Sequence, residues 1–170
     1  PSLPANYRPI AILPVMYKVF AMVVLDRIRP VLDSLQPSEQ AGFRPSFGCS
    51  DHVHTLRLLA EKAAEWGQTI WCASLDLEKA FDKVLHGMVL GSLQLAGIEA
   101  NVASTLRHLY SDLSAQVQLE PGNRSRPIRI CRGVRQGDPM SPMLFIHVLG
   151  LALRNVCEKW ERERRGTIVG

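Results

Sequence analysis

Apolar residues recur at spacings of three and four between residues 15 and 35, which is the periodicity of one buried face of an α-helix. Pro30 lies inside this stretch, and we expect it to kink or divide the helix. Residues 1–14 contain four prolines and are therefore expected to be extended. Residues 36–50 are interrupted by Gly and Pro, which predicts a loop.

A second helix and a buried strand are predicted in the next part of the chain. Ser50 or Asp51 can cap the start of this helix, which is expected to run to Trp66 and to stop at Gly67. Residues 69–77 (Thr-Ile-Trp-Cys-Ala-Ser-Leu-Asp-Leu) are rich in residues that favour β-structure, which indicates a buried strand.

Helices and a hairpin are predicted further along. Helical segments are expected near residues 79–96 and 100–112. Apolar and polar residues alternate over 114–120 and again over 126–134, on either side of a turn at Pro121-Gly122-Asn123. This pattern is typical of an antiparallel β-hairpin.

The C-terminal part of the chain is expected to be a long helix. It follows Pro139, which suits the first turn of a helix, and runs to about Arg165. Residues 166–170 indicate a turn that leads into a strand. The mixture of helices, a hairpin and a buried strand predicts a layered α+β fold.

Composition and charge limit the class of protein. The chain of 170 residues is the size of one domain or two small interleaved ones, and such a chain can bury about 70% of its unfolded surface. Apolar residues make up 46% and charged residues 21%, which excludes a disordered chain. The net charge of +4 is uneven, because residues 1–100 carry 9 basic and 10 acidic side chains and residues 101–170 carry 11 and 6. The basic excess favours a polyanionic partner for the second part.

The cysteines and apolar runs exclude further classes. No CxxC pair occurs, which argues against a disulfide framework or a zinc knuckle and favours reduced thiols in an intracellular protein. Cys49, His52 and His54 lie close together but lack a nearby fourth metal ligand. No apolar run reaches the length of a membrane span, and we expect no signal peptide. The chain opens without Met, and we expect it to be a segment of a longer chain. The cysteines are Cys49, Cys72, Cys131 and Cys157.

Three short stretches carry candidate chemistry, and the first is residues 74–82. Asp76 ends the predicted strand, and a turn and a helix follow it. A carboxylate at the end of a strand is held rigidly and stays accessible, so it suits a hard divalent cation. Spacing alone favours the alternative, in which Asp76 caps the next helix and Asp82 lies on its solvated face.

The other two stretches suit phosphate groups. Residues 132–142 form a basic strand, a Gly-containing loop and a helix start, and loop amides at a helix start favour phosphate or a nucleotide. Between residues 121 and 137 there are five arginines and no acidic residue, which favours nucleic acid over a solvated edge strand. In residues 40–45, Gly and Pro fix a loop that projects Phe43 and Arg44, and an arginine can fork onto phosphate oxygens. The five arginines are Arg124, Arg126, Arg129, Arg132 and Arg135.

In this order, the stretches resemble the reverse transcriptase family, specifically the type found in non-LTR (LINE-like) retrotransposons and group II introns. Residues 6–10 (Asn-Tyr-Arg-Pro-Ile) resemble the family's first fingers motif. Residues 40–45, followed by Asp-His-Val at 51–53, resemble the second. Residues 76–82 match the first palm motif, an Asp four residues before Ala-Phe. Residues 135–142 (Arg-Gln-Gly-Asp-Pro-Met-Ser-Pro) match the next motif closely and are the most specific of the four.

The resemblance implies an RNA-directed DNA polymerase with the right-hand fold. A primer 3′-hydroxyl attacks the α-phosphate of a nucleoside triphosphate, pyrophosphate leaves, and two Mg²⁺ ions offset the charge. The implied partners are an RNA template, a DNA primer or target, and dNTP. The implied fingers take about residues 1–68 and 84–137, and the palm takes about residues 69–83 and 138–170.

The resemblance also implies roles for single residues around the triphosphate. Asp76 is the implied catalytic metal ligand, and the Leu77 carbonyl is a second metal contact. The backbone amides of Lys79 and Ala80 would meet the triphosphate. Phe81 occupies the steric-gate position, where a bulky ring excludes the 2′-hydroxyl of a ribonucleotide.

Other implied contacts come from the basic motif and the fingers. Gln136 and Gly137 would contact the incoming nucleotide and the nascent base pair. Arg44, together with Arg8, would reach the triphosphate from the fingers. The nucleic-acid contacts implied along the template are Arg126, Arg129, Arg132 and Arg135.

One family motif has no counterpart in the chain. The next palm motif is an aromatic residue, any residue, and Asp-Asp, and no Asp-Asp pair occurs in the 170 residues. One carboxylate cannot hold two cations and a triphosphate, and Glu78 and Asp82 are interpreted as surface residues of the following turn and helix. We therefore expect fingers and a partial palm, truncated before the Asp-Asp motif and inactive alone. A catalytically dead nucleic-acid-binding module and a fragment of a group II intron maturase stay open as alternatives.

Overall fold

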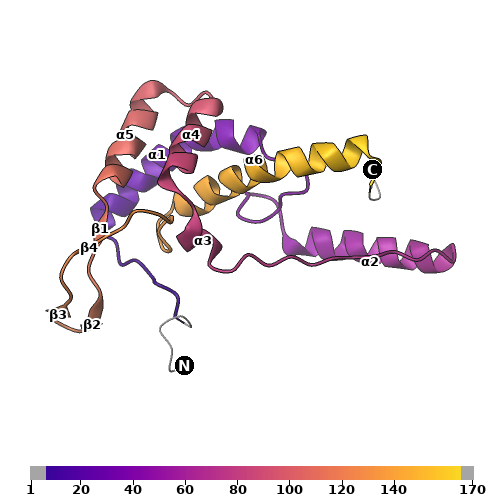
Figure 1. Ribbon diagram of the computed structural model, residues 1–170, viewed down its shortest axis with the longest axis horizontal. Coiled ribbons are helices and arrows are strands. Elements are labelled where there is room, and N and C mark those ends of the chain that lie inside the picture. The colour runs from indigo at the N-terminus through magenta and orange to yellow at the C-terminus, as the bar shows by residue number, and fades with distance from the viewer. Residues whose placement is uncertain (1–6, 166–170) are drawn as a thin grey trace.

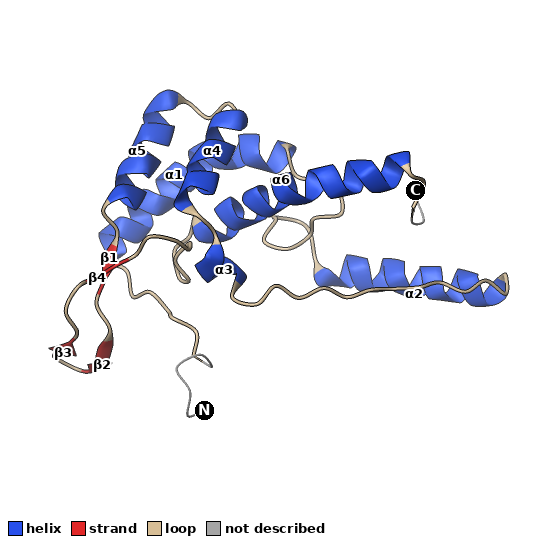
Figure 2. Ribbon diagram, in the orientation of Figure 1, coloured by secondary structure: helices blue, strands red, loops and turns tan. Residues whose placement is uncertain are grey.

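Helices dominate the computed structural model, which describes residues 7–165, and the short strands are confined to one hairpin (Figure 2). The helices are α1 (Val15–Ser34), α2 (Cys49–Glu65), α3 (Ala80–Lys83), α4 (His86–Leu95), α5 (Ala100–Ser111) and α6 (Ser141–Arg162). The strands are β1 (Ser114–Ala115), β2 (Gln118–Glu120), β3 (Asn123–Arg124) and β4 (Ile128–Arg129).

The hydrophobic core lies where α1, α4, α5 and the first half of α6 meet (Figure 1). Each of these helices contributes side chains that are almost fully buried. Burying one such side chain stabilises a fold by about 1.5–3 kcal/mol. These four helices therefore form the packed core from which the remaining segments extend. Examples are Ile28 and Leu32 on α1, Leu93 on α4, Leu106 on α5 and Leu144 on α6.

A buried histidine joins α6 to α4. The imidazole Nε2 of His147 lies 3.2 Å from the Ser92 carbonyl oxygen, and it carries the proton because a carbonyl can only accept. Burial lowers the pKa of His147 below its ordinary value. The neutral imidazole therefore packs in the core, and its Nε2 has a hydrogen-bond partner there.

The predicted hairpin is confirmed, with two short paired regions. Ser114 pairs with Arg129 across β1 and β4, and Gln118 pairs with Arg124 across β2 and β3, both antiparallel. Gly122 turns the chain with a φ of +84°, a conformation that glycine adopts without steric cost. The β2–β3 end projects away from the helical body (Figure 1).

Most of the predicted helices are also confirmed, with two corrections. Pro30 does not divide α1, which continues to Ser34. Pro30 is exposed, so water can reach the carbonyl that its missing N–H leaves free. The single helix predicted over 79–96 is instead two helices separated at Val84, which is extended because another segment pairs with it there.

The strand predicted over residues 69–77 is wrong. This stretch is an exposed, irregular segment that leads from α2 to α3 (Figure 1), with Trp71 92% exposed and Leu75 87% exposed. A strand needs a partner to bond its backbone groups, and no strand among residues 7–165 pairs with it. The residues favour β-structure, but the described part of the chain supplies no sheet for them to join.

The expected α+β fold is found in part. Helices and strands are both present, but the strands are only two or three residues long and helices make up most of the described structure. None of the helices in residues 7–165 is long and apolar enough to cross a membrane. The strand predicted over 166–170 and Asn6 of the first fingers motif lie outside the described residues.

Candidate active site

Two of the sequence motifs are joined by backbone hydrogen bonds. The Val134 amide donates to the Phe81 carbonyl at 2.8 Å, and the Gly133 amide donates to the Val84 carbonyl at 2.6 Å. The Nε2 of His86 donates to the Gly133 carbonyl at 2.9 Å. The first palm motif and the basic motif therefore form one continuous structural unit around α3.

A glycine makes this close approach possible. Gly133 has a φ of +92°, and a Cβ atom there would lie 3.0 Å from the Asp82 carbonyl oxygen. Both the backbone conformation and the contact disfavour any other residue. Gly133 therefore sets how closely the basic strand lies against α3.

Gln136 is held at both its backbone and its side chain. Its carbonyl accepts the Ala11 amide at 2.8 Å, and its Nε2 donates to Asp82 Oδ1 at 3.2 Å. Gly137 follows with a φ of +104°, and a Cβ there would lie 2.9 Å from the Ala11 carbonyl oxygen. The interpretation of Asp82 as a solvated surface residue is thus wrong, because its half-buried carboxylate binds Gln136.

Phe81 lies between two other phenylalanines. Its ring stacks on Phe145 of α6, with centroids 4.6 Å apart and planes at 20°. Phe43 approaches edge-on, with centroids 6.0 Å apart. Since all three rings restrict one another, Phe81 is a half-buried aromatic of defined orientation.

A tyrosine and an aspartate fix the loop that precedes α6. Tyr17 of α1 donates its hydroxyl to Asp138 Oδ2 at 2.5 Å, and the Met140 amide donates to Asp138 Oδ1 at 3.0 Å. Burial, followed by the Asp138 hydrogen bond, raises the pKa of the Tyr17 hydroxyl above its ordinary value. Burial likewise raises the pKa of Tyr110 to about 12. Asp138 is 4% exposed, so its two bonds satisfy a carboxylate that water barely reaches.

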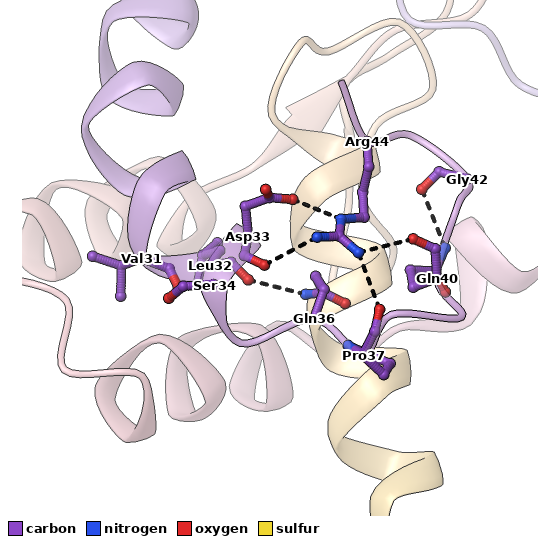
Figure 3. A network of polar contacts seen from close by, with 9 residues as sticks. All are labelled: Val31, Leu32, Asp33, Ser34, Gln36, Pro37, Gln40, Gly42 and Arg44. Atoms are coloured by element: carbon purple, nitrogen blue, oxygen red, sulfur yellow. Dashed lines mark hydrogen bonds and ion pairs between the residues drawn. The ribbon is translucent and has the colours of Figure 1, made fainter. Parts of the chain in front are cut away.

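Arg44 is folded inward and holds its own loop (Figure 3). Its Nε bonds Asp33 Oδ1 at 2.8 Å, and its Nη1 bonds the carbonyls of Pro37 and Gln40 at 3.0 and 3.2 Å. Its Nη2 reaches the Asp33 carbonyl at 3.5 Å. Four of the five N–H groups of a guanidinium are thereby used. The structure thus shows Arg44 as an anchor of the 36–48 loop, and its contact with a triphosphate stays a prediction.

The predicted metal ligands lie on the exposed segment before α3. Asp76 is exposed and has no hydrogen bond or ion pair within residues 7–165, and Leu77 beside it is also exposed. Glu78 is paired with Lys83 at 4.0 Å. The described residues contain no group of three or more acidic, His or Cys side chains suited to a metal. A carboxylate and a carbonyl suit Mg²⁺ chemically, but alone they do not make a site for two ions.

The residues predicted to meet the triphosphate and the template occupy different settings. Lys79 is exposed with a φ of +52°, and Ala80 begins α3. Arg135 is turned inward, with its guanidinium carbon 4.8 Å from the centre of the Tyr17 ring. The other three arginines predicted to contact the template are exposed, namely Arg126, Arg129 and Arg132, as is Arg124 on β3.

Sequence reasoning missed three residues of this region. It assigned no role to Tyr17 or Asp138 and misplaced Asp82. An Asp within a Gly-Pro turn directly before a helix is a signal for capping, so the part played by Asp138 could have been found. The partners of Tyr17 and Asp82 are distant in sequence, and no local pattern indicated them.

Comparison with known proteins agrees with the motifs. Residues 1–168 match the family described as reverse transcriptase (RNA-dependent DNA polymerase), and the chain belongs to that family. Its members are nucleotidyltransferases by class. The similar proteins are named as products of retrotransposable elements, so the chain is of the non-LTR (LINE-like) type.

Three relatives illustrate the similarity. The retrovirus-related Pol polyprotein from type-1 retrotransposable element R2 of Popillia japonica is 33% identical over 146 residues, which are 86% of this chain and 20% of that protein. The transposon TX1 uncharacterized 149 kDa protein of Xenopus laevis is 31% identical, covering 82% of this chain and 11% of that protein. The RNA-directed DNA polymerase from mobile element jockey of Drosophila melanogaster is 27% identical, and the match covers 82% of this chain and 15% of that protein. The chain spans a fifth or less of the length of these relatives.

Proposed function

We propose that this chain is the part of an RNA-directed DNA polymerase that receives the incoming deoxynucleotide and guides the template. It would serve a retrotransposon-type element, with RNA as template and a DNA end as primer. The proposed fingers are about residues 1–68 and 84–137, and the proposed palm is about 69–83 and 138–170. An intracellular setting suits the four exposed free thiols.

The observation that carries this proposal is the union of the two most specific motifs around Phe81. The hydrogen bonds from Gly133 and Val134 place the basic motif beside the ring, and Phe145 stacks on the ring and fixes its plane. A fixed aromatic beside a nucleotide-contacting loop is the arrangement that exclusion of a 2′-hydroxyl requires. We assign sugar selection to Phe81 and base-pair contact to Gln136 and Gly137.

The triphosphate would meet the start of α3. We propose the backbone amides of Lys79 and Ala80 as its contacts, with Arg8 and Arg44 approaching from the fingers. Arg44 would have to release part of its loop network to do so. Asp76 and the Leu77 carbonyl are the proposed Mg²⁺ ligands from this chain. Since the described residues do not form a two-metal site alone, we expect the 170-residue polypeptide to bind nucleotide without polymerising.

The template would follow the hairpin. Arg126, Arg129 and Arg132 are exposed on its returning arm, where guanidinium groups are free to meet phosphates. Arg135 is proposed as the last contact of this row, next to Gln136, although its guanidinium packs on Tyr17. The row would hold the template close to the nucleotide-contacting loop.

Nucleotide binding tests the proposal directly. We would titrate the ¹⁵N-labelled chain with dATP and MgCl₂, and separately with ATP and MgCl₂, and follow the amide resonances. We expect shifts around residues 79–81 and 136–137, weaker binding for ATP, and loss of the Mg²⁺-dependent part of binding in Asp76→Ala. Phe81→Val should reduce the preference for dATP. Binding of RNA with no response to either nucleotide would instead support the catalytically dead nucleic-acid-binding module.

A further inference from the structure

Asp82 contacts Gln136 through a side-chain hydrogen bond that joins two motifs. The Nε2 of Gln136 lies 3.2 Å from Asp82 Oδ1. Both side chains are half-buried, so water competes with this bond only in part. The backbone around Asp82 is fixed as well, because the Val134 amide bonds the carbonyl of Phe81 and the Gly133 amide bonds that of Val84. The contact therefore connects two segments that are already held in register.

A carboxylate can determine how an amide side chain is turned. An ionised Asp only accepts hydrogen bonds, whereas the amide of Gln has a donating end and an accepting end. Facing Asp82, Gln136 gains a bond only when its NH₂ group is turned toward the carboxylate. Its Oε1 is then directed away from Asp82, where no described residue bonds it.

We propose that Asp82 is a positioning residue that orients the Gln136 amide, so that Gln136 presents its carbonyl oxygen as an acceptor to the nucleotide. The proposal rests on the function proposed above for Gln136. The Ala11 amide fixes the Gln136 backbone at 2.8 Å, which leaves the side-chain torsions as the freedom that Asp82 removes. Asp82 itself does not touch the nucleotide.

The first test measures the orientation without any nucleotide. In the ¹⁵N-labelled chain, the Gln136 side-chain amide is assigned by its absence in Gln136→Ala. We expect its protons to exchange slowly with water, and Asp82→Ala should raise the exchange rate and shift the resonance. Asp26→Ala is the matched control, because Asp26 is an exposed Asp on α1 without a described hydrogen bond or ion pair. If Asp82→Ala changes neither the exchange rate nor the resonance of the Gln136 amide, the proposal is overturned.

The second test measures dATP affinity in the presence of MgCl₂ by the same titration. We expect Asp82→Ala and Gln136→Ala each to weaken binding about 5- to 10-fold, the effect of one lost hydrogen bond. The double variant should be no weaker than Gln136→Ala alone. Asp82→Asn should lie between wild type and Asp82→Ala, because its amide oxygen still accepts but its NH₂ permits the opposite orientation. Circular dichroism shows whether each variant is folded.

The outcomes separate the positioning role from the proposed function. If Gln136→Ala weakens binding and Asp82→Ala does not, Asp82 is no positioning residue. Additive losses in the double variant also overturn the proposal, since they show independent action. A third outcome is that Gln136→Ala binds dATP as tightly as wild type, while the Gln136 amide of the otherwise wild-type chain responds to Asp82→Ala. In that case Asp82 does orient Gln136, and the proposed contact of Gln136 with the nucleotide is wrong.

Discussion

At the scale of single residues, the site depends on buried polar groups with more than one partner. Arg44 bonds Asp33 and two loop carbonyls, and its side chain is only 9% exposed. Phe47 lies beneath the guanidinium, with its centroid 4.1 Å from the Arg44 Cζ. A planar fork can serve all of these partners together, whereas an ammonium group cannot. The chemistry of arginine is therefore required even without a bound phosphate.

We predict that Arg44→Lys destabilises the chain by about 1–3 kcal/mol, because it leaves loop carbonyls and the Asp33 carboxylate without donors. Urea unfolding measures this loss, and limited proteolysis should cut the 36–48 loop faster. Arg57→Lys is the matched control, since Arg57 is exposed and, among residues 7–165, pairs only with Glu61 one turn away. Equal stability of the two variants would contradict an anchoring role for Arg44.

The hydroxyl of Tyr17 should affect how the stability of the chain depends on alkaline pH. Its pKa, like that of Tyr110, is raised in the folded chain. As pH rises, the unfolded chain therefore loses these protons before the folded chain does. The neutral hydroxyls contribute their full stability below about pH 10, and this contribution falls as pH rises further. We expect Tyr17→Phe to cost about 1–3 kcal/mol at pH 7 through the partly unsatisfied Asp138. It should also reduce the fall in stability above pH 10, measured by urea unfolding from pH 8 to 11. An unchanged alkaline slope would contradict the Tyr17–Asp138 bond.

At the scale of elements, the contact of the basic strand with α3 depends on Gly133. We predict that Gly133→Ala costs about 1–3 kcal/mol, because it forces a Cβ into the left-handed region and places it 3.0 Å from the Asp82 carbonyl oxygen. Gly91→Ala in the middle of α4 is the control, since nothing lies within 4 Å of a Cβ there. Alanine favours a helix over glycine, so this control should gain about 0.5–1 kcal/mol. Thermal unfolding measures both variants, and the two changes in stability should have opposite signs. A Gly133→Ala variant as stable as wild type would contradict the observed close approach.

The elements also show what a sequence can predict. Apolar periodicity predicted α1 and α5, and the capping residues and Pro139 predicted α2 and α6, each to within a few residues. The division between α3 and α4 was not predictable, because Gly133 imposes it from a distant segment. The stretch 69–77 failed for a related reason: its residues favour a strand, but pairing decides whether a strand forms.

Site residues divide in the same way. Residues within contiguous motifs, such as Phe81 and Gln136, could be selected as candidates from the sequence, and their roles stay predictions. Tyr17 and Asp82 could not, because their roles arise from partners on other elements. Arg44 was identified, but the sequence could not show that its own loop engages its guanidinium in this conformation.

At the scale of the whole molecule, positive charge is present at both ends. The hairpin and the C-terminal end of α6 lie at opposite ends of the molecule (Figure 1). Arg126, Arg129 and Arg132 are on the arm that returns from the hairpin, and a second basic group is at the end of α6, where Glu161 and Glu163 alternate with it. This second group is Arg162, Arg164 and Arg165. If net charge alone attracts RNA, the two groups are equivalent. If the hairpin guides the template, only the first group forms phosphate contacts.

A charge-matched pair of variants distinguishes these cases. Replacing either group of three arginines by Gln lowers the formal net charge from +4 to +1. For single-stranded RNA, each lost phosphate contact reduces the slope of log K against log salt concentration by about 0.7. We therefore predict that the hairpin variant loses about 2 from this slope and most of its affinity at low salt, whereas the α6 variant keeps the wild-type slope. Fluorescence anisotropy with a labelled oligonucleotide over a series of KCl concentrations measures both. Equal losses in the two variants would mean that the molecule attracts RNA through its overall charge, and the hairpin would lose its proposed place along the template.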